Sequence, residues 1–369
     1  MSVPGERLHA PAAQARPGFL RALISDDTPR SRLVGLLVVS IVVLLAIVPF
    51  AFGGAKAINV AAKVVVFILL VASYDLLLGY TGIVSFAHTM FFGIGAYGIS
   101  IASSRMGAGW DAIFVGLGAA LVVTGVLALI IGLFSLRVRA IFFAMITLAV
   151  ASAFQTLASQ LSWLTGGEDG LSFSVPRVLK PAFRWFEIEA FDATVDGRML
   201  SYYLLFAVVL VSFLVLMRIV NSPFGRVLQA IRENEFRAEA IGYRTVVYRT
   251  LSNVIGALFA ALAGALYAIW VRYNGPDTTL AFEIMLDILL IVVIGGMGTM
   301  YGAVIGSALF LFAQSYLQDV LGWIGQAFSA VPFTAELFSA ERWLLWLGLL
   351  FVLSVYFFPT GIVGRLRGH

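Results

Sequence analysis

The sequence has no cysteine, few charged residues and little histidine. Only 12% of its 369 residues are charged. Without cysteine there is neither a disulfide framework nor a thiolate metal site. The three histidines, His9, His88 and His369, are too scattered to predict metal binding, and no Ser/His/Asp arrangement follows from the spacing. The phosphate-binding pattern G-x-x-x-x-G-K-[ST] is missing as well. We therefore expect no enzyme, and neither a metal nor a cofactor in this chain.

Hydrophobic residues dominate the composition instead. They make up 61% of the chain, and the mean hydropathy is +0.98. Apolar runs of about 20 residues, the length that a helix needs to cross a bilayer, recur along the sequence. These features predict an all-α, polytopic membrane protein with about ten transmembrane helices. The predicted spans are residues 33–52, 58–79, 86–104, 112–134, 140–160, 201–219, 250–271, 282–297, 301–320 and 343–358.

The distribution of charge predicts how these spans are oriented. The predicted regions are a disordered cytoplasmic tail (1–32), a transmembrane domain (33–358) and a second cytoplasmic tail (359–369). With ten spans, both tails and the loop at 221–243 fall on one side, which carries fifteen of the 24 lysines and arginines. The loop at 161–200, with six acids and four bases, falls on the external side. The positive-inside rule then places both termini in the cytoplasm. The same rule explains the pI near 9.4 better than nucleic-acid binding does.

The loop at 221–243 is a charged island between two apolar spans. Five arginines and three glutamates lie within residues 226–249. Ser222 and Pro223 predict a helix start, because serine caps exposed backbone amides and proline fits the first helical position. Glu233 and Arg237 are four residues apart and are expected to support this helix as an ion pair.

The predicted helix in this loop is amphipathic. Its apolar face would carry Phe224, Val227, Leu228 and Ile231. Gly242 is the expected stop. An amphipathic helix between two spans either lies on the lipid surface or docks onto a soluble partner, and its own sequence leaves both open.

The segment 74–98 contains a predicted break in a helix. Gly79 and Gly82 bracket Tyr80 and Thr81, and backbone groups that such a break exposes must be covered by protein or line a cavity. Beyond the break, Gly93, Gly95 and Gly98 spell the dinucleotide fingerprint G-x-G-x-x-G. No strand precedes these three glycines and no acidic residue follows about 20 positions later, so we interpret them as close helix packing. Small residues four apart predict the same role at Gly256, Ala260 and Gly264, and at Gly298, Gly302 and Gly306.

Four ionisable residues are expected within the membrane, where an ionised side chain costs about 2.5 kcal/mol or more. They are Asp75, His88, Glu283 and Asp287. Such residues mark substrate or ion pathways, unless water or a neighbouring helix satisfies them. Asp75 and His88 lie near the cytoplasmic ends of their spans, Glu283 lies near an outer end, and Asp287 lies deeper. Lys63 is early enough in its span to reach outward to the interface.

Four motifs carry a resemblance to a known family. They are GYTGIVSFAHTMFFGIGAY (79–97), LTGGEDGL (164–171), GRVLQAIRENEFRAEAIGY (225–243) and IGGMGTMYGAVIGSAL (294–309). In this order they resemble motifs of the permease subunits of ATP-binding-cassette importers, specifically the branched-chain amino acid family and its permease type with a T-G-G-x-x-G-L loop. The resemblance covers residues 58–320 apart from 172–200. Phe86 and Met90 depart from the family pattern, and Ala303 stands where a proline is usual.

The resemblance implies roles for particular residues. The 221–243 loop would be a cytoplasmic coupling loop whose helix rests in a groove of an ATPase subunit. The residues expected in this coupling are Pro223, Gly225, Arg226, Leu228, Ile231, Arg232, Glu239 and Gly242. The residues expected along the translocation pathway are Gly79, Thr81, Gly82, Ser85, His88 and Asp287, of which Asp287 matches an acidic residue of the family.

The resemblance also implies partners and a cargo. The expected partners are a second related permease, two ATPase subunits that bind ATP and magnesium, and an external solute-binding protein, all at a bacterial inner membrane. Closure of the ATPases on ATP is expected to move the helix at Pro223, and the sixth and seventh spans to pass this motion to 79–82. The implied cargo is leucine, isoleucine or valine, although relatives carry urea, short amides, other amino acids and aromatic acids. The alternative is an ion-coupled carrier that works alone, with Asp75, His88 or Asp287 as its proton or sodium site.

Overall fold

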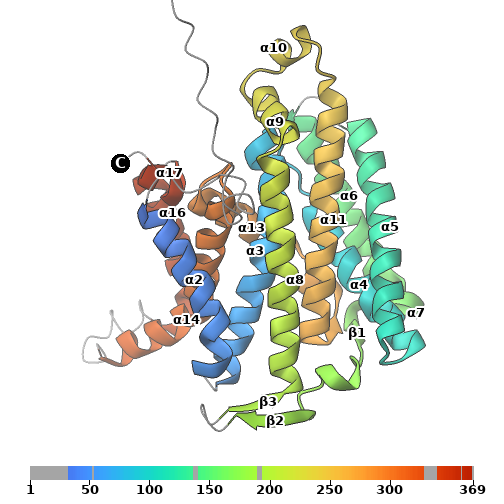
Figure 1. The fold of residues 1–369 in the computed structure, drawn as a ribbon, viewed down its shortest axis with the longest axis vertical. Helices are drawn as coiled ribbons and strands as arrows, with labels where there is room; N and C mark the ends of the chain where they lie inside the picture. The colour runs from blue at the N-terminus through green and yellow to red at the C-terminus, as the bar shows by residue number, and fades with distance from the viewer. Residues whose placement is uncertain are drawn as a thin grey trace, which may run out of the picture.

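The computed structural model describes residues 32–51, 54–135, 140–188, 193–327, 339–358 and 360–367. Nearly all of this part is helical, which confirms the all-α prediction (Figure 1). The long helices are α2 (Arg32–Ala51), α3 (Ala55–Thr81), α4 (His88–Met106), α5 (Trp110–Ser135), α6 (Ala140–Gln160), α8 (Gly197–Val220), α11 (Thr245–Val271), α13 (Phe282–Gly295), α14 (Met300–Ala327) and α16 (Trp343–Phe357). His9, His369 and most of the two predicted tails lie outside the described residues.

The helices fit a protein that crosses a membrane many times. Eight segments of the described chain are long and apolar enough to span a bilayer. The other two predicted spans correspond to α4, which has 19 residues but is less apolar, and α16, which has 15 residues and is shorter, so the structure supports eight of the ten. The chain is therefore a polytopic membrane protein, as its composition indicated.

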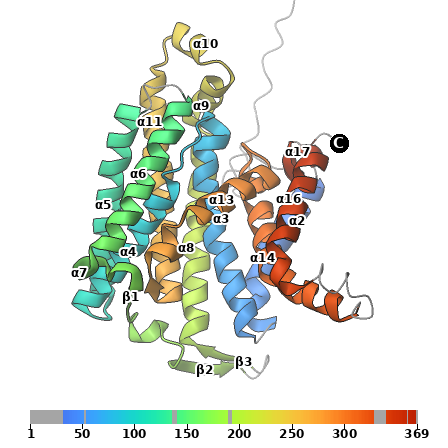
Figure 2. The same cartoon turned by 180° about the vertical axis from the view of Figure 1, so that it is seen from behind.

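Helix α3 lies at the centre of the molecule. It packs against α8, α11, α13 and α14 (Figures 1 and 2), and every residue from Val64 to Leu77 is buried. A helix that is apolar on all sides has to be buried in this way. The outer helices α2, α5 and α6 expose large apolar side chains, among them Leu36, Phe114 and Ile141. In a membrane protein these surfaces face lipid or another apolar subunit.

Glycines allow several helix pairs to approach closely. A side chain at Gly95 of α4 would overlap the carbonyl oxygen of Ala261 on α11, and one at Gly264 of α11 would overlap that of Phe92 on α4. Three more of the predicted packing glycines also leave no room for a side chain: Gly93 lies against the Leu280 side chain, Gly256 against the Ser73 carbonyl oxygen and Gly306 against the Ile291 carbonyl oxygen. Interfaces between membrane helices depend on such small residues.

The two ends of the helical bundle differ. Helices α9 (Pro223–Glu233) and α10 (Glu235–Ala240) form one end, and the antiparallel hairpin of β2 (Arg184–Ile188) and β3 (Ala193–Asp196) lies at the other (Figure 1). Helix α17 (Gly361–Arg367) contacts α2 and lies towards the α9 end. The first and last described helices therefore share a side with α9, as an even number of spans requires.

The segment predicted as an external loop is folded in its described part. It contains α7 (Ser162–Thr165), the 3-10 turns η1 (Gly167–Asp169) and η2 (Arg177–Leu179), and β1 (Leu171–Ser172). Strand β1 pairs antiparallel with β4 (Tyr273–Asn274), just before α12 (Pro276–Thr279). Gly166, Gly167 and Gly170 have φ angles of 78°, 66° and 68°. The T-G-G-x-x-G-L element needs glycine at these places because other residues avoid left-handed backbone.

Several predicted boundaries are wrong. Helix α11 begins five residues before 250, and α14 ends seven residues after 320. Helix α3 continues through Tyr80 and Thr81, so its break begins at Gly82 and not at Gly79. Gly82 ends the helix with a φ of 76°, and its amide donates to the Leu78 carbonyl oxygen at 3.1 Å. Helix α8 begins at Gly197, four residues before the predicted span, because Asp196 caps it. Hydropathy missed that first turn because the turn is polar.

Candidate functional site

The cytoplasmic helix α9 begins where the sequence predicts, but it is capped differently. Pro223 occupies the first turn. The hydroxyl of Ser222 does not cap the helix amides; it donates instead to the Ile219 carbonyl oxygen at 2.6 Å. The expected pair of Glu233 and Arg237 is wrong as a support within one helix, because Asn234 separates α9 from α10.

The break at Asn234 and the end of α10 have local causes. Asn234 is extended, with φ −160°, and its side chain caps α10 by accepting from the Arg237 amide at 2.9 Å. Gly242 follows α10 with a φ of 98°, which fits its predicted role as a stop. Glu239 accepts from the Thr245 hydroxyl at 2.7 Å and ties α10 to the start of α11.

The apolar face of α9 is buried within the chain. Val227, Leu228 and Ile231 are 9%, 0% and 2% exposed. They lie where α9 packs against α3, α8 and α11. The apolar face is thus used internally, which removes the reason for α9 to lie on the lipid surface. Its polar face remains open to solvent, because Arg226 and Gln229 are exposed.

Arg232 connects α9 to two other parts of the chain. Its guanidinium donates to the carbonyl oxygen of Gly79, in the last turn of α3. The Arg232 side chain also lies directly against Gly82 and against Gly298, in the turn between α13 and α14. One side chain of the predicted coupling helix therefore touches both glycine-rich breaks of the membrane domain.

Asp75 bonds to Gly298 from within the helical bundle. This residue is 2% exposed, and its Oδ1 accepts from the backbone amide of Gly298 at 2.9 Å. Gly298 has a φ of 78°, so its amide points into the bundle only because the turn is left-handed there. The carboxylate is also attracted electrostatically by Arg232. Asp75, Gly79, Arg232 and Gly298 together are called the α3 junction below.

His88 is held inside the protein at the start of α4. It is 2% exposed, and its Nε2 lies 2.9 Å from the Ser73 hydroxyl oxygen. That hydroxyl donates to the Leu70 carbonyl oxygen at 2.7 Å, so it accepts from the His88 ring. The ring also packs on Tyr74, with centroids 5.1 Å apart. His88 therefore fixes α4 to α3.

The other residues predicted to line a pathway are mostly buried in helix contacts. Thr81 lies 3.1 Å from the Ser252 hydroxyl of α11 and donates to the Leu76 carbonyl oxygen at 3.0 Å. Ser85 is 1% exposed and accepts from the Ala87 amide at 3.3 Å. Gly79 is buried, and Gly82 is exposed beside Arg232. Gly79 and Thr81 therefore lie in the last turn of α3, and Gly82 and Ser85 lie in the break between α3 and α4.

Asp287 belongs to a different cluster, on α3, α13 and α14. Its Oδ2 accepts from the Gln314 side-chain amide at 3.2 Å, and Gln314 Oε1 accepts from Lys63 at 3.0 Å. All three residues are half-buried. The expectation that Lys63 reaches outward to the interface is wrong, because it bonds to Gln314 at mid-helix and lies over the Phe67 ring. Glu283, one turn before Asp287, is exposed.

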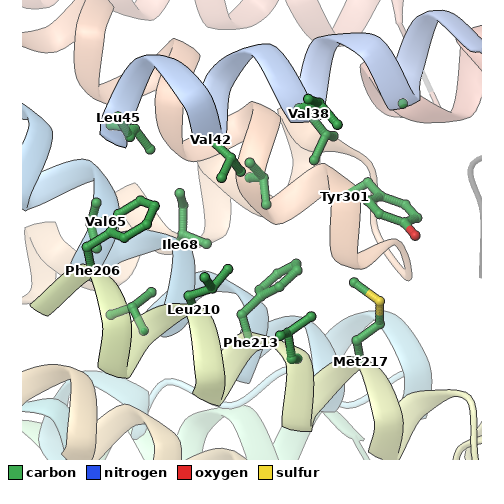
Figure 3. Close-up of a pocket in the computed structure, with 15 residues that line it drawn as sticks. Val38, Val42, Leu45, Val65, Ile68, Phe206, Leu210, Phe213, Met217 and Tyr301 are labelled. Atoms are coloured by element: carbon green, nitrogen blue, oxygen red, sulfur yellow. The ribbon is translucent and has the colours of Figure 1, made fainter. Parts of the chain in front are cut away.

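Two hollows in the described chain contain none of the predicted site residues. One, of about 240 Å³, lies between α2, α3, α8 and α14 and has apolar walls that include Val42, Ile68 and Phe213 (Figure 3). The other, of about 510 Å³, lies between α4, α5 and α6, with Arg105 at one end. The predicted pathway residues therefore lie outside these two hollows.

Sequence reasoning missed four partners: Ser73, Ser252, Lys63 and Gln314. Each is a polar residue inside an apolar span, and that signal was available for all four. Hydropathy could not tell which of them meet in space, because their partners lie on helices far apart in the sequence.

Comparisons with known proteins agree with this architecture. Residues 56–355 match the family model described as "Branched-chain amino acid transport system / permease component". The chain is 24% identical to the high-affinity branched-chain amino acid transport system permease protein LivM of Salmonella typhimurium, over 95% of this chain and 79% of that protein. It is 26% identical to the corresponding permease protein LivH of Escherichia coli, over 80% of this chain and 91% of that protein. No solved structure matches significantly. Since the family model spans most of the sequence, the chain belongs to the permease component family of branched-chain amino acid transport systems.

Proposed function

We propose that this chain is one permease subunit of an ATP-binding-cassette importer. It would form half of a translocation pathway for branched-chain amino acids or related small polar solutes in a bacterial inner membrane. The observation that carries this proposal is α9, whose apolar face is anchored inside the bundle while its polar face stays exposed. An element that is rigidly attached on one side and open on the other is suited to receive a soluble ATPase.

The α3 junction supplies a direct route for such coupling. A displacement of α9 pulls on Gly79 through Arg232, and Gly79 lies in the last turn of the central helix. Asp75 links that same helix to Gly298, so the α13–α14 turn moves with it. Helix α9 also packs against α8 and α11, which retains the expected route through the sixth and seventh spans. Coupling would therefore reach both glycine-rich breaks.

The partners follow from the same proposal. The matched relatives include two permease types, LivM and LivH, which supports a second related permease beside this chain. Two ATPase subunits would bind ATP and magnesium, and an external binding protein would deliver the solute. The alternative, a carrier driven by an ion gradient through Asp75, His88 or Asp287, has less support because it gives no role to a cytoplasmic helix whose polar face stays exposed.

Co-purification tests the proposal. We expect that this chain, expressed with its neighbouring genes and purified in mild detergent, brings a second permease and two ATPases that mass spectrometry identifies. Reconstituted with its binding protein, the complex should take up solute only with ATP. Recovery of the chain alone, folded and active with an ion gradient, would contradict the proposal.

A further inference from the structure

Three polar side chains from three membrane helices meet inside the membrane domain. Lys63 is about 12 Å along α3 from its start, given a rise of 1.5 Å per residue. Gln314 on α14 and Asp287 on α13 lie at the same contact, with hydrogen bonds of 3.0 Å and 3.2 Å along the series Lys63, Gln314, Asp287. Charged side chains at membrane depth are costly, and they generally face a pathway or a partner.

The hydrogen bonds among Lys63, Gln314 and Asp287 leave some of their donors and acceptors unused. An ammonium group has three donors, and a carboxylate accepts at both oxygens. Within the described chain, the Lys63 ammonium uses one donor and lies over the Phe67 ring, and Asp287 uses one oxygen of its carboxylate. Because both residues are only half-buried, the remaining capacity is open to a solute.

A nearby pair of opposite charges between α3 and α14 forms a direct ion pair, in contrast to Lys63 and Asp287. Lys56 and Asp319 join α3 to α14 directly at 2.5 Å, with side chains 53% and 47% exposed. At Lys63 and Asp287 the opposite charges are joined through the amide of Gln314 instead. An amide can both donate and accept, so this arrangement presents a positive group, a neutral polar group and a negative group side by side.

We propose that Lys63, Gln314 and Asp287 form a head-group site for a zwitterionic α-amino acid. Lys63 binds the carboxylate of the solute, Asp287 binds its ammonium group, and Gln314 holds the two side chains apart. This inference rests on the proposed transport function and adds a basis for selection. A neutral solute such as urea compensates neither charge, and a solute with one charge leaves the other charge unpaired, which is costly away from bulk water. The site therefore favours amino acids over amides.

The test uses the complete complex in proteoliposomes with its binding protein. The probe is the amino acid that the wild-type complex takes up fastest from a panel of the common twenty. We expect Lys63→Gln and Asp287→Asn each to lower ATP-driven uptake about tenfold or more, as expected for a lost charge-assisted bond. The double variant should be no better than the poorer single variant. The yield of complex and its ATP hydrolysis without solute should stay within about twofold of the wild-type values. A twofold change is well below the tenfold loss of uptake, which corresponds to about 1.4 kcal/mol.

Lys56→Gln and Asp319→Asn are the matched controls, since they remove the same two kinds of charge from a separate ion pair that joins α3 to α14. Uptake by these controls should equal that of the wild type. Recovery of uptake in the double variant would overturn the site, because it would mean that Lys63 and Asp287 only neutralise each other. Unchanged uptake in the single variants would overturn it too, as would a wild-type complex that carries urea and no amino acid. A wild-type complex without any ATP-driven uptake would instead overturn the proposed function itself.

Discussion

Arg232 donates a hydrogen bond from the cytoplasmic helix α9 to the carbonyl oxygen of Gly79, 153 residues earlier in the sequence. Gly79 lies in the last turn of α3, so its carbonyl has no partner further along that helix. The guanidinium of Arg232 donates to this carbonyl oxygen and so attaches α9 to the central helix. The bond is therefore both a helix cap and a mechanical connection.

Removal of this connection should weaken coupling. Arg232→Ala is expected to lower solute-stimulated ATP hydrolysis of the assembled complex about tenfold, because a hydrogen bond from a charged group is worth about 1.5–3 kcal/mol. Arg232→Lys keeps the positive charge but loses the planar guanidinium group. Its rate of solute-stimulated ATP hydrolysis should therefore lie between those of the wild type and Arg232→Ala. Affinity for the binding protein should not change, since the residue lies at the opposite end from the external loop. Solute-stimulated hydrolysis equal to that of the wild type would contradict this role.

Asp75 should matter for stability. Asp75→Ala leaves the half-buried Gly298 amide without its acceptor, and the loss of an acceptor from a buried donor costs about 1–3 kcal/mol. Asp75→Asn retains an acceptor oxygen and should be milder. We expect thermal unfolding of the purified complex in detergent to shift to lower temperature in the order wild type, Asn, Ala. If the Ala variant unfolds like the wild type, Asp75 does not hold the α13–α14 turn.

The sequence predicted the spans and the amphipathic helix because both depend on local periodicity. Hydropathy indicates ten spans, and the face of Val227, Leu228 and Ile231 is read directly from the 3.6-residue repeat. The α3 junction could not be found this way. Asp75 and Gly298 are 223 residues apart, and their contact depends on how α3 packs against the α13–α14 turn. The same holds for Lys63, whose partner Gln314 is 251 residues away.

The external T-G-G-x-x-G-L element should tolerate no side chain at its left-handed positions. Gly170→Ala forces alanine into a φ of 68° and places its Cβ 2.5 Å from the Asn274 carbonyl oxygen, beside the β1–β4 pair. Left-handed backbone costs an alanine about 1–2 kcal/mol. We expect faster proteolysis of the 161–200 segment in the purified complex. Gly54→Ala is the control, since nothing lies within 4 Å of the position and its φ is −77°. Equal proteolysis of both variants would contradict this explanation of the motif.

Gly302 should be essential for helix packing. A Cβ placed on Gly302 of α14 would lie 2.8 Å from the Gly296 carbonyl oxygen and 2.9 Å from the Gly295 carbonyl carbon. The Thr299 hydroxyl oxygen, which lies closer still, could rotate aside, but the two backbone atoms cannot. Overfilling a packed interior costs about 1–3 kcal/mol, and a leucine adds four carbons where not even one fits. Gly302→Leu is therefore expected to abolish assembly, measured as the yield of complex after size-exclusion chromatography in detergent.

Gly118→Leu is the matched control for Gly302→Leu. Gly118 lies on α5, is exposed, and has nothing within 4 Å of a Cβ. The same leucine there should meet only lipid or detergent, and the yield should stay near that of the wild type. Normal assembly of Gly302→Leu would mean that α13 and α14 can separate without loss of the fold. Loss of assembly in both variants would instead indicate that this membrane domain tolerates no added bulk, even on its outer surface.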